Sequence, residues 1–177
     1  MVSSLDGIIA KKDNSVSWFE TTSNYEKGVS GQDPEEFLKT IDCYIMGSRT
    51  YELALELSKS YGWAYGDKPT IVVTSRNLPV DRENIEFYSG DLHKLVNEWL
   101  KPNYKNVWLV GGAVLAKDFI RLKLADDIRV SVLPIILGEG TLFFDRVGQE
   151  QALNLKDVTA YKNGMVEMWY EVRQLKP

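Results

Sequence analysis

Two adjacent glycines, Gly111 and Gly112, follow an apolar stretch at 107–110 and precede a helical pattern that runs to about residue 122. Such a corner places bare backbone N–H groups at a helix N-terminus, where the helix dipole favours an anion. Glycine also lets the backbone approach a ligand closely. The pair therefore points to a phosphate-binding corner. A tight strand-to-helix turn without a ligand is the alternative, because the segment is neither a P-loop nor a GxGxxG pattern.

Two further apolar stretches end in hydroxyl-bearing and cationic residues. The stretch 43–46 ends at Gly47 and continues as Ser48-Arg49-Thr50, and the stretch 70–73 continues as Thr74-Ser75-Arg76. A guanidinium fork beside hydroxyl donors suits a phosphate dianion. The two arginines could equally be surface cations, but their places at strand ends favour phosphate binding.

The periodicity of the chain places these three ends in one sheet. Apolar runs of strand length alternate with helical patterns up to Leu122, which is typical of an α/β fold with a largely parallel sheet. We expect strands at 43–46, 70–73, 85–88 and 107–110, and helices at 33–41, 48–57, 91–100 and 113–122. In such sheets ligands bind beyond the carboxyl ends of the strands, where the three ends lie.

Strand patterns dominate the rest of the chain. Residues 128–134 alternate as a strand should, and the runs 153–161 and 165–172 flank Asn163-Gly164. Asn-Gly between alternating runs is a strong hairpin signal. The sequence therefore predicts an antiparallel hairpin at the C-terminal end of a mixed, mostly parallel sheet.

Composition limits the classes of function. The chain has 177 residues, of which 44% are hydrophobic, so we expect a single domain over 1–177. A net charge of -4 with scattered basic residues argues against nucleic-acid binding. One cysteine (Cys43) and one histidine (His93) argue against an internal disulfide framework and a metal site. No signal peptide or membrane-length apolar run is present, so we expect a cytoplasmic protein without membrane contact.

Five motifs in order resemble the dihydrofolate-reductase superfamily, and within it most closely the reductase domain of riboflavin biosynthesis (the RibD C-terminal domain). They are Ser4-Leu5-Asp6-Gly7, Met46-Gly47-Ser48-Arg49-Thr50-Tyr51, Val73-Thr74-Ser75-Arg76, Val110-Gly111-Gly112 and Pro134-Ile135-Ile136-Leu137-Gly138-Glu139-Gly140. Each motif alone is weak, whereas their order and spacing are fairly specific. The resemblance covers nearly the whole chain.

This resemblance implies a three-layer α/β/α fold around a mixed sheet and an NADPH-dependent reductase that is dimeric in the riboflavin branch. The substrate would be a small pteridine-like or ribosylaminopyrimidine heterocycle, such as 5-amino-6-(5-phosphoribosylamino)uracil. Dihydrofolate reduction is the alternative within enzymes. A nucleotide- or flavin-binding protein without turnover is the alternative outside them.

The resemblance also assigns cofactor contacts. Gly111 and Gly112, which the family often joins through a cis peptide, would cradle the pyrophosphate, and Ser75 with Arg76 would hold the adenosine 2′-phosphate. Trp18 matches an aromatic residue of the loop that closes over the nicotinamide, although it could also be a loop-tip hydrophobe. The expected cofactor contacts are Trp18, Gly47, Ser48, Arg49, Thr50, Thr74, Ser75, Arg76, Val110, Gly111, Gly112, Ala113, Val114 and Leu115.

Two carboxylates are candidates for the catalytic acid. Asp33 stands four residues before Phe37, as the dihydrofolate reductase carboxylate stands before its helix aromatic. The same residue also looks like a helix N-cap, with Pro34 in the first turn and Glu36 completing a capping box. Asp6 would contact the substrate or, equally, fix its own turn through a side-chain hydrogen bond.

Several positions depart from the riboflavin branch. Val110 replaces a glutamate that binds substrate, Leu38 stands near the place of a substrate-phosphate arginine, and Ser48 replaces an arginine. The printed sequence shows no deaminase motifs beside those of the reductase, so we do not expect the bifunctional deaminase-reductase. Most relatives carry a full strand before the Ser4 motif, so the sequence as numbered is expected to lack N-terminal residues. The cofactor half of the interpretation is therefore better supported than the substrate half.

Overall fold

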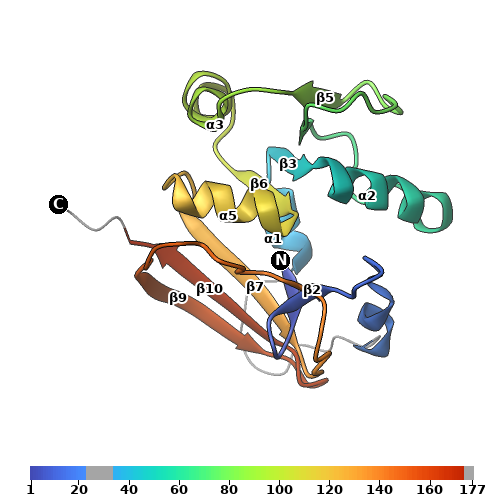
Figure 1. Ribbon diagram of the computed structural model, residues 1–177, viewed down its shortest axis with the longest axis vertical. Coiled ribbons are helices and arrows are strands. Elements are labelled where there is room, and N and C mark those ends of the chain that lie inside the picture. Colours follow the sequence, from blue (N-terminus) through green and yellow to red (C-terminus); the bar gives the residue numbers. More distant parts are fainter. Residues whose placement is uncertain (23–33, 174–177) are drawn as a thin grey trace. The chain divides into compact units, whose positions relative to one another are not determined.

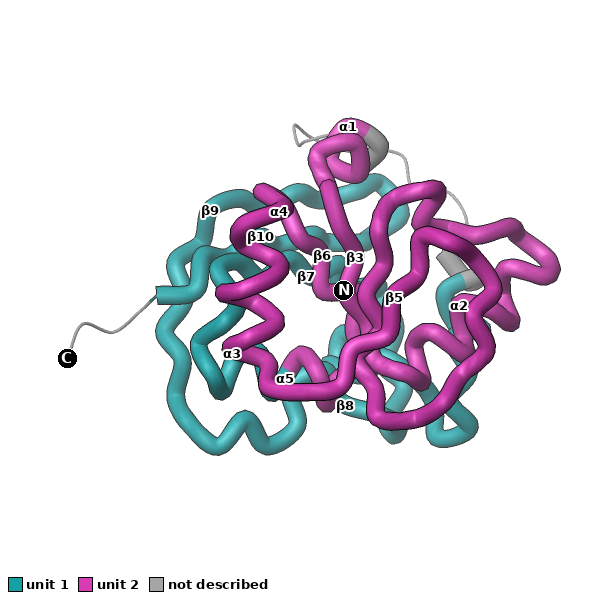
Figure 2. Tube along the Cα trace, turned by 90° about the horizontal axis from the view of Figure 1, so that it is seen from above, with its two compact units in different colours: residues 1–32, 117–177 teal, residues 33–116 magenta. Residues whose placement is uncertain are grey.

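A computed structural model of the chain describes residues 1–22 and 34–173. The chain forms two compact units, which Figure 2 shows in different colours. Unit 2 comprises Asp33–Ala116, and unit 1 comprises Met1–Gln32 with Lys117–Pro177. The boundary falls inside helix α5 (Ala113–Arg121). The expectation of one domain over 1–177 stays a prediction.

Unit 2 is built on a four-stranded sheet in the order β5-β4-β3-β6, and all its strands are parallel. The strands are β3 (Cys43–Gly47), β4 (Thr70–Val73), β5 (Ile85–Tyr88) and β6 (Val107–Gly111). The first four residues of β3 and the first three of β4 are buried, because both strands are near-continuous apolar runs. The predicted parallel sheet is confirmed.

Three helical segments of unit 2 precede or connect these strands: the first leads into β3, the second links β3 to β4, and the third links β5 to β6 (Figure 1). They are α1 (Pro34–Lys39), α2 (Ser48–Tyr61) and a run made of α3 (Leu92–Lys94), a π-helical turn η2 (Leu95–Leu100) and α4 (Lys101–Asn103). Asp91 caps this run, because its carboxylate accepts a hydrogen bond of 3.0 Å from the Lys94 N–H. The sequence predicted this helix over 91–100, but the helical run continues to Asn103.

Unit 1 contains a four-stranded sheet in the order β1-β7-β10-β9. Strand β1 (Val2–Ser4) runs parallel to β7 (Asp127–Leu133), whereas β7, β10 (Val166–Val172) and β9 (Leu153–Ala160) are antiparallel. Strand β2 (Ile8–Ala10) pairs with β8 (Thr141–Leu142). The C-terminal hairpin predicted from Asn163-Gly164 is confirmed, because β9 and β10 pair on either side of this turn.

Each unit has its own buried cluster. Met46, Tyr51, Val72 and Ile85 form a cluster in unit 2. In unit 1, Trp18, Leu133, Tyr161 and Met165 pack together. Trp18 belongs to a 3-10 helix, η1 (Ser17–Thr22), in a region for which the sequence predicts a loop. Among the described residues no helix is both long enough and apolar enough to span a membrane.

Candidate functional site

The carboxyl ends of β4, β3 and β6 lie side by side in the sheet of unit 2. Gly47 pairs with Val73 across β3 and β4, and Met46 pairs with Gly111 across β3 and β6. The β3–β6 register shifts between Ile45 and Met46 and thereby brings Gly111 level with the end of β3. The sheet thus brings together the residues that follow these strands. We call these residues, 47–50, 74–76 and 111–112, the strand-end cluster.

The glycine corner is closely packed against the start of α2. The Gly111–Gly112 peptide is cis, as the resemblance implied, and Gly111 has a φ of 141°, a conformation that L side chains rarely adopt. A Cβ on Gly112 would lie 3.3 Å from the Thr50 hydroxyl oxygen, and a Cβ on Gly47 would lie 3.7 Å from the Gly112 nitrogen. The absence of side chains at Gly47 and Gly112 therefore lets the corner approach the first turn of α2 closely.

Helices α2 and α5 both begin at the strand-end cluster. In the described part of the chain, no side chain caps α2 at Gly47, and neither helix has an acidic residue in its first turn. Their first N–H groups therefore keep an unopposed partial positive charge, which suits a phosphate group. In α5 the Val114 side chain is exposed and that of Leu115 is buried, so Leu115 could contact a ligand only through its backbone.

Arg76 is engaged by a carboxylate. Its two terminal guanidinium nitrogens donate to Glu52 of α2 at 3.0 and 2.5 Å. The pair remains accessible to solvent, since 53% of the Arg76 side chain and 42% of the Glu52 side chain are exposed. The hydrogen bonds from Arg76, together with its charge and that of Arg49, lower the pKa of Glu52. Both arginines therefore lie close enough to this carboxylate to act on it.

The turn after β4 is fixed locally. The Thr74 hydroxyl accepts a hydrogen bond of 3.0 Å from the Arg76 N–H, an ST-turn geometry that sets the direction of this segment. The Ser75 side chain is exposed, as is that of Arg49. Hydroxyl and guanidinium groups are thus available at the ends of both β3 and β4.

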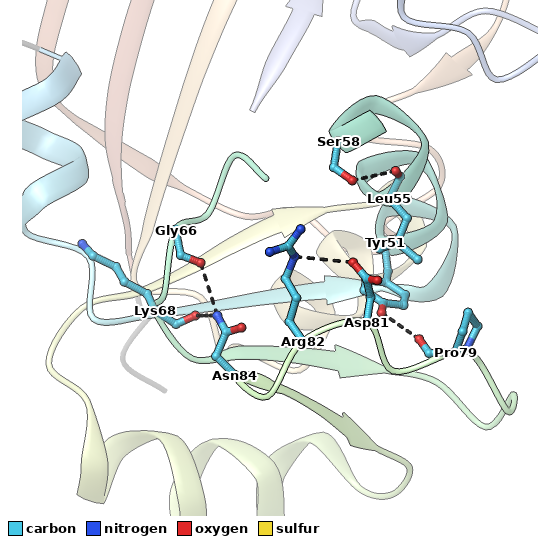
Figure 3. A network of polar contacts seen from close by, with 9 residues as sticks. All are labelled: Tyr51, Leu55, Ser58, Gly66, Lys68, Pro79, Asp81, Arg82 and Asn84. Carbon is cyan, nitrogen blue, oxygen red and sulfur yellow. Dashed lines mark hydrogen bonds and ion pairs between the residues drawn. The ribbon is translucent and has the colours of Figure 1, made fainter. Parts of the chain in front are cut away.

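The rest of the β4–β5 connection is anchored within unit 2 (Figure 3). The Tyr51 hydroxyl donates to the Pro79 carbonyl at 2.8 Å, and the Asn84 amide donates to the Gly66 and Lys68 carbonyls at 3.3 and 2.8 Å. Tyr51 is fully buried, so the segment following Arg76 is tied to the core beneath α2. This anchoring limits how far the chain at Arg76 can move from Glu52.

Asp6, the candidate acid of unit 1, is saturated by hydrogen bonds. Its carboxylate accepts from the Ser4 hydroxyl at 2.6 Å and from the N–H groups of Leu137 and Gly138 at 3.2 and 2.7 Å. These bonds, led by that from Ser4, lower the pKa of Asp6 to about 2. The carboxylate is therefore ionised at neutral pH and holds the loop after β7. The bond from Ser4 is local, whereas the other two hold a loop that is distant along the chain, a role that differs from an Asx bond within the Asp6 turn.

The remaining expected site residues have less direct placements. Trp18 is 2% exposed in the core cluster of unit 1, which corrects the alternative of a loop-tip hydrophobe. Val110 packs against the buried cluster of unit 2, and Leu38 is 40% exposed. Asp33 lies outside the described residues. No group of three or more His, Cys, Asp or Glu able to hold a metal ion occurs among the described residues.

Glu52 was not identified from the sequence. A signal was present, because Glu52 stands three residues after Arg49 in the predicted helix, and residues at that spacing share one helix face. The partner in the fold, however, is Arg76, which is 24 residues away along the chain. Only the parallel pairing of β3 and β4 brings this arginine to the start of α2.

Comparisons with known proteins agree with this fold. The family model of the RibD C-terminal domain matches residues 1–167. The Bacillus subtilis protein YwjB is 30% identical over 153 residues, which cover 86% of this chain and 84% of YwjB. The crystal structure of a Shewanella sp. PV-4 protein has a TM-score of 0.81 at 20% identity, with 98% of this chain and 97% of that chain covered. The expected α/β fold is confirmed.

One of the similar proteins is named as a reductase. The 2,5-diamino-6-ribosylamino-4(3H)-pyrimidinone 5′-phosphate reductase of Aquifex aeolicus is 30% identical over 83 residues, which cover 41% of this chain and 37% of that enzyme.

Proposed function

The chain belongs to the RibD C-terminal domain family, and on that premise we propose that it is an NADPH-dependent reductase. Its substrate is a small heterocycle, pteridine-like or a ribosylaminopyrimidine such as 5-amino-6-(5-phosphoribosylamino)uracil. The name of the Aquifex aeolicus relative supports the ribosylaminopyrimidine class. A cytoplasmic homodimer is part of the same proposal.

The observation that carries the proposal is the gathering of anion-binding groups in the strand-end cluster. Two helix N-termini, a glycine corner without side chains, and the arginines Arg49 and Arg76 occupy adjacent strand ends. All of these groups are suited to phosphate rather than to a cation. The residues of unit 2 thus fit the phosphates of a phosphorylated dinucleotide.

Within this proposal each group has a separate task. The backbone at Gly111–Gly112 and the first amides of α2 and α5 hold the pyrophosphate. Ser75 and Arg76 hold the adenosine 2′-phosphate, and Arg49 with Thr50 adds charge and a hydroxyl donor. When bound, the nicotinamide supplies the hydride, and the protein binds and orients the reactants.

On the substrate side the proposal separates two carboxylates. Asp6 acts as a positioning residue, because its oxygens already hold the loop at Leu137 and Gly138. Asp33 remains the candidate for the proton donor, with the helix N-cap as its alternative role. Trp18 remains a candidate neighbour of the nicotinamide. Packing in the buried cluster of unit 1 is its alternative role.

The first test is to measure binding and turnover separately. Titration calorimetry with NADPH and with NADH measures binding, and the loss of NADPH absorbance measures turnover on the ribosylaminopyrimidine and on dihydrofolate. We expect micromolar or tighter NADPH binding and oxidation on the ribosylaminopyrimidine. Oxidation on dihydrofolate alone would instead support a dihydrofolate reductase. Binding without oxidation on either compound would indicate a nucleotide-binding protein, and no binding would refute the cofactor assignment.

A further inference from the structure

The Arg76 guanidinium, which is the group assigned to the 2′-phosphate, is already held by a carboxylate of the same unit. Glu52 takes both terminal nitrogens of Arg76, at 3.0 and 2.5 Å. These are the donors that a phosphate would use, because guanidinium binds carboxylate and phosphate through the same planar fork. A bound 2′-phosphate and Glu52 therefore cannot both use this fork.

We propose that Glu52 is a specificity-determining residue that competes with the 2′-phosphate of NADPH for Arg76 and thereby narrows the preference for NADPH over NADH. This inference rests on the proposed function. It adds to it a residue of α2 that opposes binding of the cofactor's distinguishing group.

The surroundings of the pair make an exchange of partners feasible. Both side chains are exposed to solvent, so water can hydrate Glu52 when it turns away from Arg76. Breaking this exposed ion pair therefore costs little free energy. The backbone at Arg76 is kept in place by Thr74, so the guanidinium remains at the strand end when its partner leaves. The incoming phosphate is a dianion at neutral pH, so its attraction to the guanidinium exceeds that of the singly charged Glu52 carboxylate, which favours the exchange.

NADH offers no such competition. It has a ribose 2′-hydroxyl in place of the phosphate, and this hydroxyl neither requires the guanidinium nor is repelled by a carboxylate. Loss of the Glu52 charge should therefore change NADPH affinity and leave NADH affinity almost unchanged. The ratio of the dissociation constants of NADPH and NADH therefore measures the effect of the Glu52 charge on cofactor preference.

The test uses the full chain and a matched control. Glu52→Gln removes the charge and keeps the shape, and Glu56→Gln does the same one turn further along α2, where Glu56 pairs with Lys59. Calorimetric titration measures the dissociation constants of NADPH and NADH. We expect Glu52→Gln to tighten NADPH binding about fivefold, a factor equivalent to about 1 kcal/mol, the upper end for an exposed ion pair. NADH binding should change less than twofold, as should both constants in Glu56→Gln.

A double-mutant cycle with Arg76→Gln separates competition from simple repulsion. Competition requires Arg76, so Glu52→Gln should have no effect on NADPH affinity when Arg76 is already replaced. An unchanged or lowered NADPH preference in Glu52→Gln overturns the inference, and so does a gain that persists in the Arg76→Gln background. If wild type binds NADPH and Glu52→Gln does not alter the preference, only this inference fails. If no nucleotide binds to any variant, the proposed function fails with it.

Discussion

Adding a single methyl group at Gly112 should lower nucleotide affinity while leaving folding almost unchanged. In Gly112→Ala the new Cβ would lie 3.3 Å from the Thr50 hydroxyl oxygen, a contact that a shift of a few tenths of an ångström relieves. Gly112 also lacks the left-handed φ of its neighbour Gly111. We therefore expect the free energy of unfolding to fall by less than about 1 kcal/mol, within the range of tolerated small packing changes.

The effect of Gly112→Ala on NADPH affinity should be much larger. The methyl group would occupy the space through which a pyrophosphate approaches the backbone N–H groups of the corner. Loss of one hydrogen bond to a charged group is worth about 1.5–3 kcal/mol, so NADPH affinity should fall by about 10- to 150-fold. Chemical denaturation measures the first quantity, and calorimetric titration with NADPH measures the second.

Gly111→Ala is the comparison that tests the reasoning. It places a Cβ at a φ of 141°, so we expect it to destabilise the protein by about 1–3 kcal/mol in addition to lowering its affinity for the nucleotide. If Gly112→Ala bound NADPH within threefold of wild type while folding normally, the glycine corner would not be a phosphate site.

Three further predictions concern unit 1 and the buried thiol. Gly140→Ala should lower the melting temperature far more than Gly138→Ala, because a Cβ on Gly140 would lie 2.3 Å from the Ala10 carbonyl oxygen whereas one on Gly138 meets nothing within 4 Å. Asp6→Asn should destabilise the protein at pH 7. Because folding lowers the pKa of Asp6 from 3.8 to about 2, its stabilising contribution is complete above pH 4 and lost as the pH falls toward 2. Denaturation of wild type and Asp6→Asn across this range should show the two stabilities converging, and a constant difference would contradict the assignment. Burial raises the pKa of Cys43 to about 12, so a thiol reagent at pH 8 should react with the unfolded chain and not with the native protein.

Local patterns were sufficient for most of the architecture. Strands β3, β4 and β6 were predictable because each is an apolar run bounded by residues that end it, and the hairpin because Asn163-Gly164 stands between two alternating runs. The π-helical turn at Leu95–Leu100 was not predictable, since its apolar spacing is also compatible with an ordinary α-helix. The 3-10 helix at Ser17–Thr22 is short and lacks a repeating period.

The candidate site was predictable only in part, because the sequence shows local patterns but not contacts between distant segments. Glycines and hydroxyl residues after strands can be read from the sequence, because the carboxyl ends of parallel strands share one edge. The partners of the charged side chains depend on contacts between distant segments. No sequence pattern indicated that Arg76 would bind Glu52, or that Asp6 would hold Leu137 and Gly138.

The two carboxylates differ in how readily they could exchange their partners for a ligand. Asp6 accepts hydrogen bonds from Ser4 and from two backbone N–H groups, so turning it toward a substrate would leave three donors without their acceptor and release a loop. Glu52 is held by a single exposed guanidinium, and water can replace that partner at little free-energy change. A carboxylate with several fixed donors behaves as part of the framework, whereas one with a single mobile partner can give it up to a stronger anion. For this reason we assign a positioning role to Asp6 and a competitive role to Glu52, although both are exposed acids beside expected ligand contacts.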